Sequence, residues 1–158
     1  MNATSINHNE LIDLLQRAYS AEKAAAFAYQ GHASSLKIKS EKDAVKQIEI
    51  DEWNHREEVL KIMNAYNIPV SRYYEFRFYI IGKLISLSCH VIGRFMPFYF
   101  AGRLESGNVC EYFRMRQFFH SLGIRTHDQI LYDMGMKEKE LDFFLTTFEK
   151  KLKLSHLL

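Results

Sequence analysis

The sequence predicts an all-α protein built as a four-helix bundle with a long connecting helix. Only 7 Gly and 2 Pro occur among 158 residues, too few for a turn-rich all-β fold. Apolar residues recur at spacings of three and four over several helix-length stretches. The two halves of the chain also share one pattern, a pair of glutamates on either side of a predicted turn, which indicates a repeated helical hairpin. These observations favour two packed hairpins.

The first hairpin is predicted to join a helix over 9–36 to a helix over 40–66. Ser40-Glu41-Lys42-Asp43 is similar to a capping box at the start of the second helix, and Asn67-Ile68-Pro69 cannot continue it. One face of the first helix carries Leu11, Leu14, Leu15, Ala18, Ala21, Ala25 and Tyr29. The inward positions of the second are predicted to be Ala44, Ile48, Glu52, His55, Val59 and Ile62. Arg56, Glu57 and Lys61 are predicted to lie in solvent.

The second hairpin is predicted to join a helix over 98–122 to a helix over 126–154. Leu122-Gly123 favours a helix C-cap, and Thr126-His127-Asp128-Gln129 is typical of a capping box. The predicted inward positions are Val109, Tyr112 and Met115, then Ile130, Met134, Glu138, Leu141, Leu145 and Phe148. A chain of this length is expected to form one domain over 1–158.

The connecting helix is predicted over 73–97, within an apolar stretch that reaches residue 101. Lys83, His90 and Arg94 interrupt it at spacings of seven and four, which places three basic groups on one face and disfavours a transmembrane helix. Pro97 should kink or end it. Two interpretations remain open. The helix is either a crossover that packs on the core, or an interfacial helix that rests on a membrane or opens to an apolar substrate.

Composition excludes several classes of protein. The net charge is +2 with acids and bases interspersed, which gives no electrostatic case for nucleic-acid binding. Cys89 and Cys110 form no C-x-x-C pair and no disulfide lattice, so a reducing compartment fits. The first residues are polar and are not typical of a signal peptide. We therefore expect a cytoplasmic location.

A candidate metal site emerges from the spacing of four glutamates and one histidine. Glu52 and His55 stand three apart, on one face of a helix. The turn near residue 39 lies seventeen residues after Glu22 and thirteen before Glu52; the turn near residue 124 lies nineteen after Glu105 and fourteen before Glu138. Antiparallel helices would bring each pair to nearly the same height. Bundles that bind two metals have this layout, with Glu from two helices and Glu-x-x-His from the other two.

The chemistry of such a site favours iron. Four carboxylates cannot share a dry core as bare anions, because like charges raise one another's pKa, whereas two divalent ions would neutralise them. Carboxylate-rich sites with little nitrogen suit iron or manganese better than zinc. The predicted metal ligands are Glu22, Glu52, His55, Glu105 and Glu138. Tyr29 and Tyr112 are either groups that orient these carboxylates or aromatic core residues, and Glu22 could instead turn to solvent.

This ligand pattern resembles that of the ferritin-like di-iron carboxylate superfamily. The stretches Ala21–Ala25 through Tyr29–Gly31, and Ile81–Leu84 through Val91–Gly93, look like the demethoxyubiquinone hydroxylase branch, which acts in ubiquinone biosynthesis. The resemblance covers roughly residues 10 to 150. It implies a ferritin-like fold, two irons, an external electron donor, and hydroxylation of a lipophilic quinone-type substrate with dioxygen at the periphery of the inner membrane.

Leu141 departs from that pattern, because the family has a histidine three residues after its last glutamate. Asp142 or water could replace the missing nitrogen; otherwise the site holds one ion or none. Three functions therefore stay open. They are a di-iron monooxygenase, a ferritin-like protein that handles iron or peroxide, and a descendant with a degenerate site that acts as a binding or assembly partner. A membrane surface and a second copy of the chain, as a homodimer, are further candidate partners.

Overall fold

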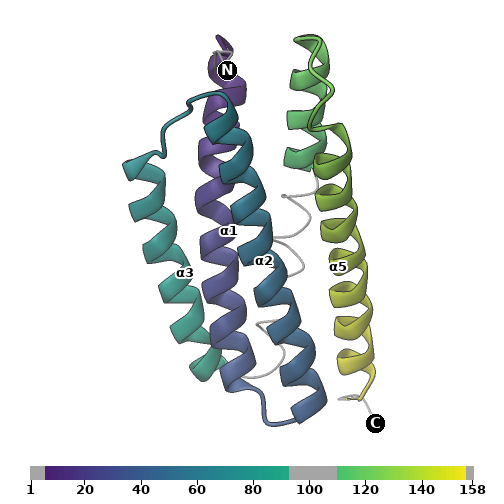
Figure 1. The fold of residues 1–158 in the computed structure, drawn as a ribbon. Coiled ribbons are helices and arrows are strands. Elements are labelled where there is room, and N and C mark those ends of the chain that lie inside the picture. Colours follow the sequence, from purple (N-terminus) through teal and green to yellow (C-terminus); the bar gives the residue numbers. More distant parts are fainter. Residues whose placement is uncertain (1–5, 93–109, 156–158) are drawn as a thin grey trace. The chain divides into compact units, whose positions relative to one another are not determined.

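Every element in the described part of the chain is an α-helix. The structure, a computed structural model, describes residues 6–92 and 110–155, with side chains up to residue 141. Its helices are α1 (Asn9–Ser35), α2 (Lys39–Ala65), α3 (Arg72–Ile92), a helix over residues 110–121, and α5 (Asp128–Ser155) (Figure 1). The all-α prediction is confirmed, whereas the four-helix bundle with its crossover stays a prediction. None of the described helices is both long and apolar enough to cross a membrane.

The chain divides into two compact units, Met1–Ser88 and Cys89–Leu158. The first unit is built on the hairpin of α1 and α2, which lie side by side around a short turn (Figure 1). Apolar residues spaced three and four apart on both helices form its core, as the periodicity predicts. The buried apolar residues of the hairpin include Leu11, Leu15, Ala18, Ala26, Tyr29, Val45, Val59, Ile62 and Met63.

Two helices end at residues in the left-handed backbone conformation. Asn67 has φ 55°, and the N–H of Ile68 donates to the carbonyl of Met63 at 2.9 Å after the last turn of α2. Gly123 has φ 73°, and the N–H of Ile124 donates to the carbonyl of Phe119 at 2.9 Å. Such bonds satisfy carbonyl groups left over at a helix end. The C-cap predicted at Leu122-Gly123 is thus confirmed.

A third helix, α3, packs closely along α1 in the first unit. A Cβ atom placed on Gly82 would come within 2.7 Å of the Cα of Ala24, and one placed on Gly31 within 2.4 Å of the Cα of Ser86. Only glycine at these two positions permits so close an approach of the two backbones. The two pairs also show that α3 runs in the same direction as α1.

The predicted capping boxes are wrong. The N-cap of α2 is Ile38, without a side-chain hydrogen bond, so Ser40 already lies inside the helix. The helix predicted from residue 126 begins at Asp128. At both sites the backbone becomes helical at a residue other than the one that the polar pattern indicates, since tertiary packing overrides local capping preferences worth only about 1 kcal/mol.

Two predicted inward positions are shifted by one residue. Ala44 is exposed and its neighbour Val45 is buried; Ile130 is half-buried and its neighbour Leu131 is buried. Each residue turns the helix by about 100°, so a choice between adjacent apolar residues decides which one faces inward. The predictions for Val109, Leu145 and Phe148 concern side chains outside those that the structure describes.

Candidate metal centre

Two buried carboxylates and a buried imidazole meet within the first unit. Glu22 on α1 and Glu52 on α2 are each 1% exposed, and His55 on α2 is 6% exposed. One ligand atom from each of the three lies within 4.8 Å of the others. The predicted meeting of Glu22 with Glu52 and His55 is therefore present in the fold.

The hairpin explains why these three residues meet. Glu22 stands thirteen residues before the last residue of α1, and Glu52 stands thirteen residues after the first residue of α2. Residues equally far from the turn of an antiparallel hairpin lie at the same height, because each rises about 1.5 Å per residue along its helix. The i, i+3 spacing then places His55 one turn from Glu52 on the same face.

The surroundings of Glu22 are apolar and tightly packed. Ala24, Ala25 and Ala26 next to it are all 8% exposed or less, so Glu22 does not rotate to solvent. A carboxylate removed from water strongly favours its neutral form unless positive charge or hydrogen bonds compensate. Two carboxylates close together add mutual repulsion to that cost. Each buried carboxylate of the site must therefore be compensated by hydrogen bonds, by positive charge or by a proton.

The cations adjacent in sequence to these ligands are engaged elsewhere. Lys23, which follows Glu22, places Nζ 2.8 Å from Oε2 of Glu75 on α3. Arg56, which follows His55, donates from Nη1 to Oε1 and from Nη2 to Oε2 of the same carboxylate, both at 3.0 Å. Ser20 also donates to Glu75, at 2.9 Å. The prediction that Arg56 lies in solvent is wrong, because this ion pair and contact with Tyr19 keep its side chain only 13% exposed.

The pKa of Glu75 reflects this network. Burial raises the pKa of the carboxyl, but the hydrogen bonds from Arg56, Lys23 and Ser20 outweigh burial and hold the pKa at about 2. Glu75 is therefore ionised throughout the physiological range. Two cations close to the metal-site residues are thus committed to a carboxylate on a different helix.

The three ligands, two carboxylates and one imidazole, fit a metal ion that prefers oxygen with some nitrogen. Carboxylate and imidazole donors bind such ions at about 2.0–2.2 Å, so two donors to one ion lie up to about 4.4 Å apart. The observed limit of 4.8 Å is close to that span. Small side-chain rotations would bring the three donors onto a common ion.

Of the two remaining predicted ligands, one is described by the structure. Glu138, on α5 in the second unit, is buried at 1% exposure and carries a ligand type that could hold a metal ion. Leu141, one turn further along α5, is half-buried. Glu105 lies outside the described residues. Tyr29 and Tyr112 are buried, at 3% and 1% exposure, as both of their predicted roles require.

Sequence reasoning did not single out two further residues of the first unit. His32 on α1 is 2% exposed, and burial lowers its pKa to about 4, so its ring is neutral at pH 7. His32 lies three residues after Tyr29, and this spacing could have predicted that it faces inward with Tyr29. Trp53, the only tryptophan, stands between Glu52 and His55 and is 37% exposed, with its ring against Phe27.

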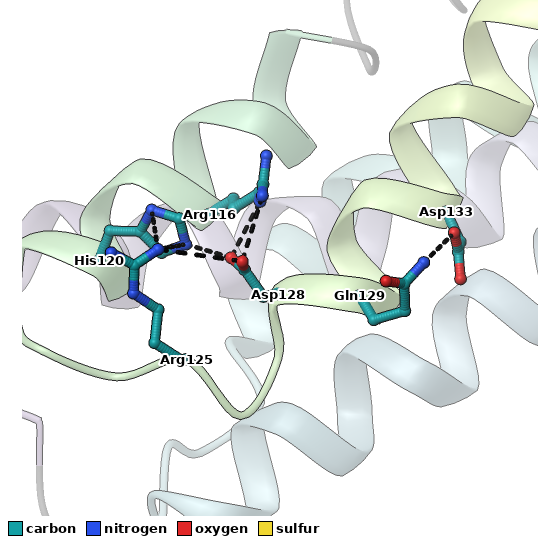
Figure 2. A network of polar contacts seen from close by, with 6 residues as sticks. All are labelled: Arg116, His120, Arg125, Asp128, Gln129 and Asp133. Atoms are coloured by element: carbon teal, nitrogen blue, oxygen red, sulfur yellow. Dashed lines mark hydrogen bonds and ion pairs between the residues drawn. The ribbon is translucent and has the colours of Figure 1, made fainter.

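A second polar cluster, in the second unit, joins the helix over 110–121 to the start of α5 (Figure 2). Asp128 accepts hydrogen bonds from Nε and Nη2 of Arg116, at 2.9 and 3.1 Å, and contacts the ring of His120, which also contacts Arg125. The hydrogen bond from Arg116 is the main cause that lowers the pKa of Asp128 to about 2. The cluster fastens a turn, and its polar atoms are committed to one another.

Comparison with known proteins gives no relative for the chain: no family model, no curated protein and no solved structure matches it.

Proposed function

We propose that the chain is an iron protein whose metal is held by Glu22, Glu52 and His55. The observation that supports this is the meeting of two buried carboxylates and a buried imidazole inside one hairpin, with ligand atoms within 4.8 Å. Lys23 and Arg56, the cations next to these ligands in sequence, are directed to Glu75, and a divalent ion would supply positive charge to the two carboxylates. The donor set, rich in carboxylate and poor in nitrogen, favours iron or manganese over zinc.

Glu138 is proposed to complete the site from α5. The support is its burial on a helix surface that is otherwise apolar, with Leu131 and Met134 also buried. The repeated hairpin adds to this, because Glu138 holds the place in the second hairpin that Glu52 holds in the first. Glu105 is proposed as a further ligand on the same repeat. A site with all five residues would hold two ions, as in the carboxylate bundles that combine Glu with Glu-x-x-His.

The proposed reaction is oxidation of a lipophilic, quinone-type molecule with dioxygen. Its support is the resemblance of the ligand pattern to the ferritin-like di-iron carboxylate proteins and their demethoxyubiquinone hydroxylase branch. Iron in such a site supplies dioxygen binding and electron transfer, with electrons from an external donor. The chain's own residues would bind the metal through Glu22, Glu52 and His55, exclude water through the packed alanines of α1, and orient carboxylates through Tyr29.

The test is metal binding by the purified full-length chain. Iron content would be measured after expression in iron-replete medium, and ferrous and manganous ions would be titrated anaerobically while the fluorescence of Trp53 is followed. We expect saturable binding that Glu52→Gln and His55→Ala each weaken at least about 100-fold, since a lost ligand should cost more than a lost supporting residue. Glu57→Gln is the matched control, because Glu57 lies on α2 with its side chain 66% exposed. Binding unchanged in His55→Ala would contradict the proposal.

A second candidate function is favoured by Leu141. An apolar residue one turn after Glu138, in the place of a metal-binding nitrogen, is what a degenerate site in a binding or assembly partner would show. In that case the wild-type chain would bind neither ion, and the buried carboxylates would be protonated or paired with Arg or Lys. The same titration separates the two functions.

A further inference from the structure

One carboxylate on α3 holds both helices of the hairpin that carries the metal site. Glu75 accepts a hydrogen bond from Lys23 of α1 at 2.8 Å, and two from Arg56 of α2, both at 3.0 Å. Lys23 directly follows Glu22 in the chain, and Arg56 directly follows His55. A single acid therefore grips each helix at the residue next to a proposed metal ligand.

The same group of side chains also joins α1 to α2 directly. Arg56 donates from Nη1 to the backbone carbonyl of Tyr19, and its guanidinium carbon lies 3.6 Å from the centre of the Tyr19 ring. Ser20 donates to Glu75 at 2.9 Å. The α1 members all lie within three residues of Glu22. We call the whole group the Glu75 clamp, and its members are Tyr19, Ser20, Lys23, Arg56 and Glu75.

The clamp is shielded and has a defined geometry. The side chains of Lys23, Arg56 and Glu75 are 19%, 13% and 22% exposed. A guanidinium and a carboxylate that make two parallel hydrogen bonds meet in one relative orientation. The height and the rotation of α1 against α2 are therefore held at the level of the metal site.

A metal site divided between two helices depends on that relation. Glu22 belongs to α1, whereas Glu52 and His55 belong to α2, so the spacing of the ligand atoms changes whenever one helix slides or turns against the other. Ligand groups must be held within about 0.5 Å and 10–20° of the geometry that binds. A clamp on the adjacent residues of both helices restricts these movements.

We infer that Glu75 is a positioning residue for the metal site, which it serves by fixing α1 against α2 where Glu22 meets Glu52 and His55. Glu75 itself supplies no ligand atom and acts through Lys23 and Arg56. Linkage makes the effect reciprocal, because an ion that prefers the clamped arrangement must stabilise the clamp to the same extent.

Metal affinity gives the first test, and this part rests on the proposed metal function. Ferrous and manganous ions would be titrated into the folded, full-length chain and into Glu75→Gln. We expect the variant to bind the same number of ions about 3- to 30-fold more weakly, the range found for residues that couple to a site without contacting the ligand. Arg56→Gln should have a similar effect. Combining Arg56→Gln with Glu75→Gln should add little, because both changes release the same clamp.

Two controls loosen α3 on α1 without altering the clamp. Tyr74 donates to Asp13 of α1 at 2.6 Å, and a Cβ on Gly31 would come within 2.4 Å of the Cα of Ser86. Asp13 and Gly31 stand nine residues before and nine residues after Glu22. Tyr74→Phe and Gly31→Ala should therefore lower the melting temperature but bind metal as the wild type does.

A second readout needs no metal. Trp53, the only tryptophan, stands between Glu52 and His55, and its ring lies edge-to-face against Phe27 of α1 with ring centres 5.7 Å apart. Its near-ultraviolet circular dichroism therefore reports how α1 meets α2 beside the site, and the ring signals of His55 in nuclear magnetic resonance report the site itself. In metal-free Glu75→Gln both should change, whereas in Tyr74→Phe both should match the wild type.

The two readouts separate this inference from the proposed function. A wild type that binds neither ion would overturn the proposed function, and the spectra of the metal-free chain would still decide the role of Glu75. Unchanged signals of Trp53 and His55 in Glu75→Gln would overturn the positioning role. Affinity that falls in Tyr74→Phe and Gly31→Ala in step with melting temperature would also overturn it, because general loosening would then explain the loss.

Discussion

Arg56 of α2 and Glu75 of α3 form a two-pronged ion pair, with both nitrogen-to-oxygen distances at 3.0 Å. The guanidinium also lies 3.6 Å from the centre of the Tyr19 ring on α1, and Lys23 and Ser20 of α1 reach the same carboxylate. Three helices are thus joined by one acid. Planar pairing of this kind is stronger than the exposed ion pairs of a helix surface, so Glu75 should matter for stability.

Glu75→Gln should lower the free energy of unfolding by about 2–3 kcal/mol, because it leaves Arg56 and Lys23 half-buried without an anion. Chemical denaturation at pH 7, followed by circular dichroism, measures this. Glu58→Gln is the control. Glu58 pairs with Lys61 at 2.8 Å on the exposed face of α2, and exposed pairs contribute about 0–1 kcal/mol. Equal losses in the two variants would show that the network adds no more than a surface pair.

The same network predicts how stability depends on pH. The pKa of Glu75 in the fold is about 2, below its ordinary value of 4.5. A carboxyl whose pKa is lowered by folding stabilises the fold above its unfolded pKa, and loses that contribution as the pH falls through the folded one. The wild type should therefore lose up to about 3 kcal/mol relative to Glu75→Gln between pH 5 and pH 2. A difference between the two proteins that stays constant over this range would contradict the low pKa.

The buried His32 affects stability at higher pH than Glu75 does, and its effect is the same in the wild type and in Glu75→Gln. Its pKa is lowered from 6.5 to about 4 in the fold, so its contribution to stability is lost as the pH falls from about 6.5 towards 4. Because Glu75→Gln leaves His32 unchanged, subtracting the two pH profiles isolates Glu75.

Much of this arrangement is encoded locally in the sequence. Pro69 and Gly123 mark helix ends, and the inward spacing of apolar residues marks the helices themselves. The meeting of Glu22 with Glu52 was predictable because counting residues from a turn fixes height in an antiparallel hairpin. These signals depend only on neighbours in the chain and on regular helix geometry.

The features that sequence reasoning missed depend on packing between helices. Arg56 looks like a solvated residue, because its partner Glu75 is nineteen residues away on a helix whose rotation is set by contacts with α1. The close approach of α3 to α1 at Gly82 and Gly31 also could not be predicted from the sequence, where each glycine only indicates a weak helix former. Predicting that Val45 rather than Ala44 faces inward requires knowing how α2 is rotated about its axis. The start of α2 gives no such signal, because its N-cap residue makes no side-chain hydrogen bond.

Gly82→Ala should destabilise the first unit although alanine is the better helix former. Its Cβ would lie 2.7 Å from the Cα and 2.9 Å from the carbonyl oxygen of Ala24, which are backbone atoms that cannot rotate away. The overpacking should cost about 1–3 kcal/mol, against a gain in helix propensity of about 1 kcal/mol. Gly135→Ala on α5 is the control, because its Cβ would meet the ring of Phe113 at 3.2 Å, and a side chain can shift. A melting temperature of Gly82→Ala at or above that of Gly135→Ala would contradict the close helix contact.

Leu141→His tests whether α5 takes part in the metal site. The change gives Glu138 a histidine one turn away, as Glu52 has His55, and Leu141 is half-buried rather than enclosed, so the imidazole can be accommodated. If α5 contributes to the site, the metal bound per chain should rise towards the two ions of a complete carboxylate bundle, or the affinity of a weak second ion should rise by at least about 10–100-fold. Combining Leu141→His with His55→Ala should leave only the new ion. Calorimetric titration with ferrous or manganous ion measures both the number of ions bound and their affinity.

Tyr132→His is the matched control, because it adds an imidazole to α5 at an exposed position and should change neither the number of ions nor their affinity. Equal behaviour of Leu141→His and Tyr132→His would place Glu138 outside the site and leave Glu22, Glu52 and His55 as the metal ligands of the hairpin alone.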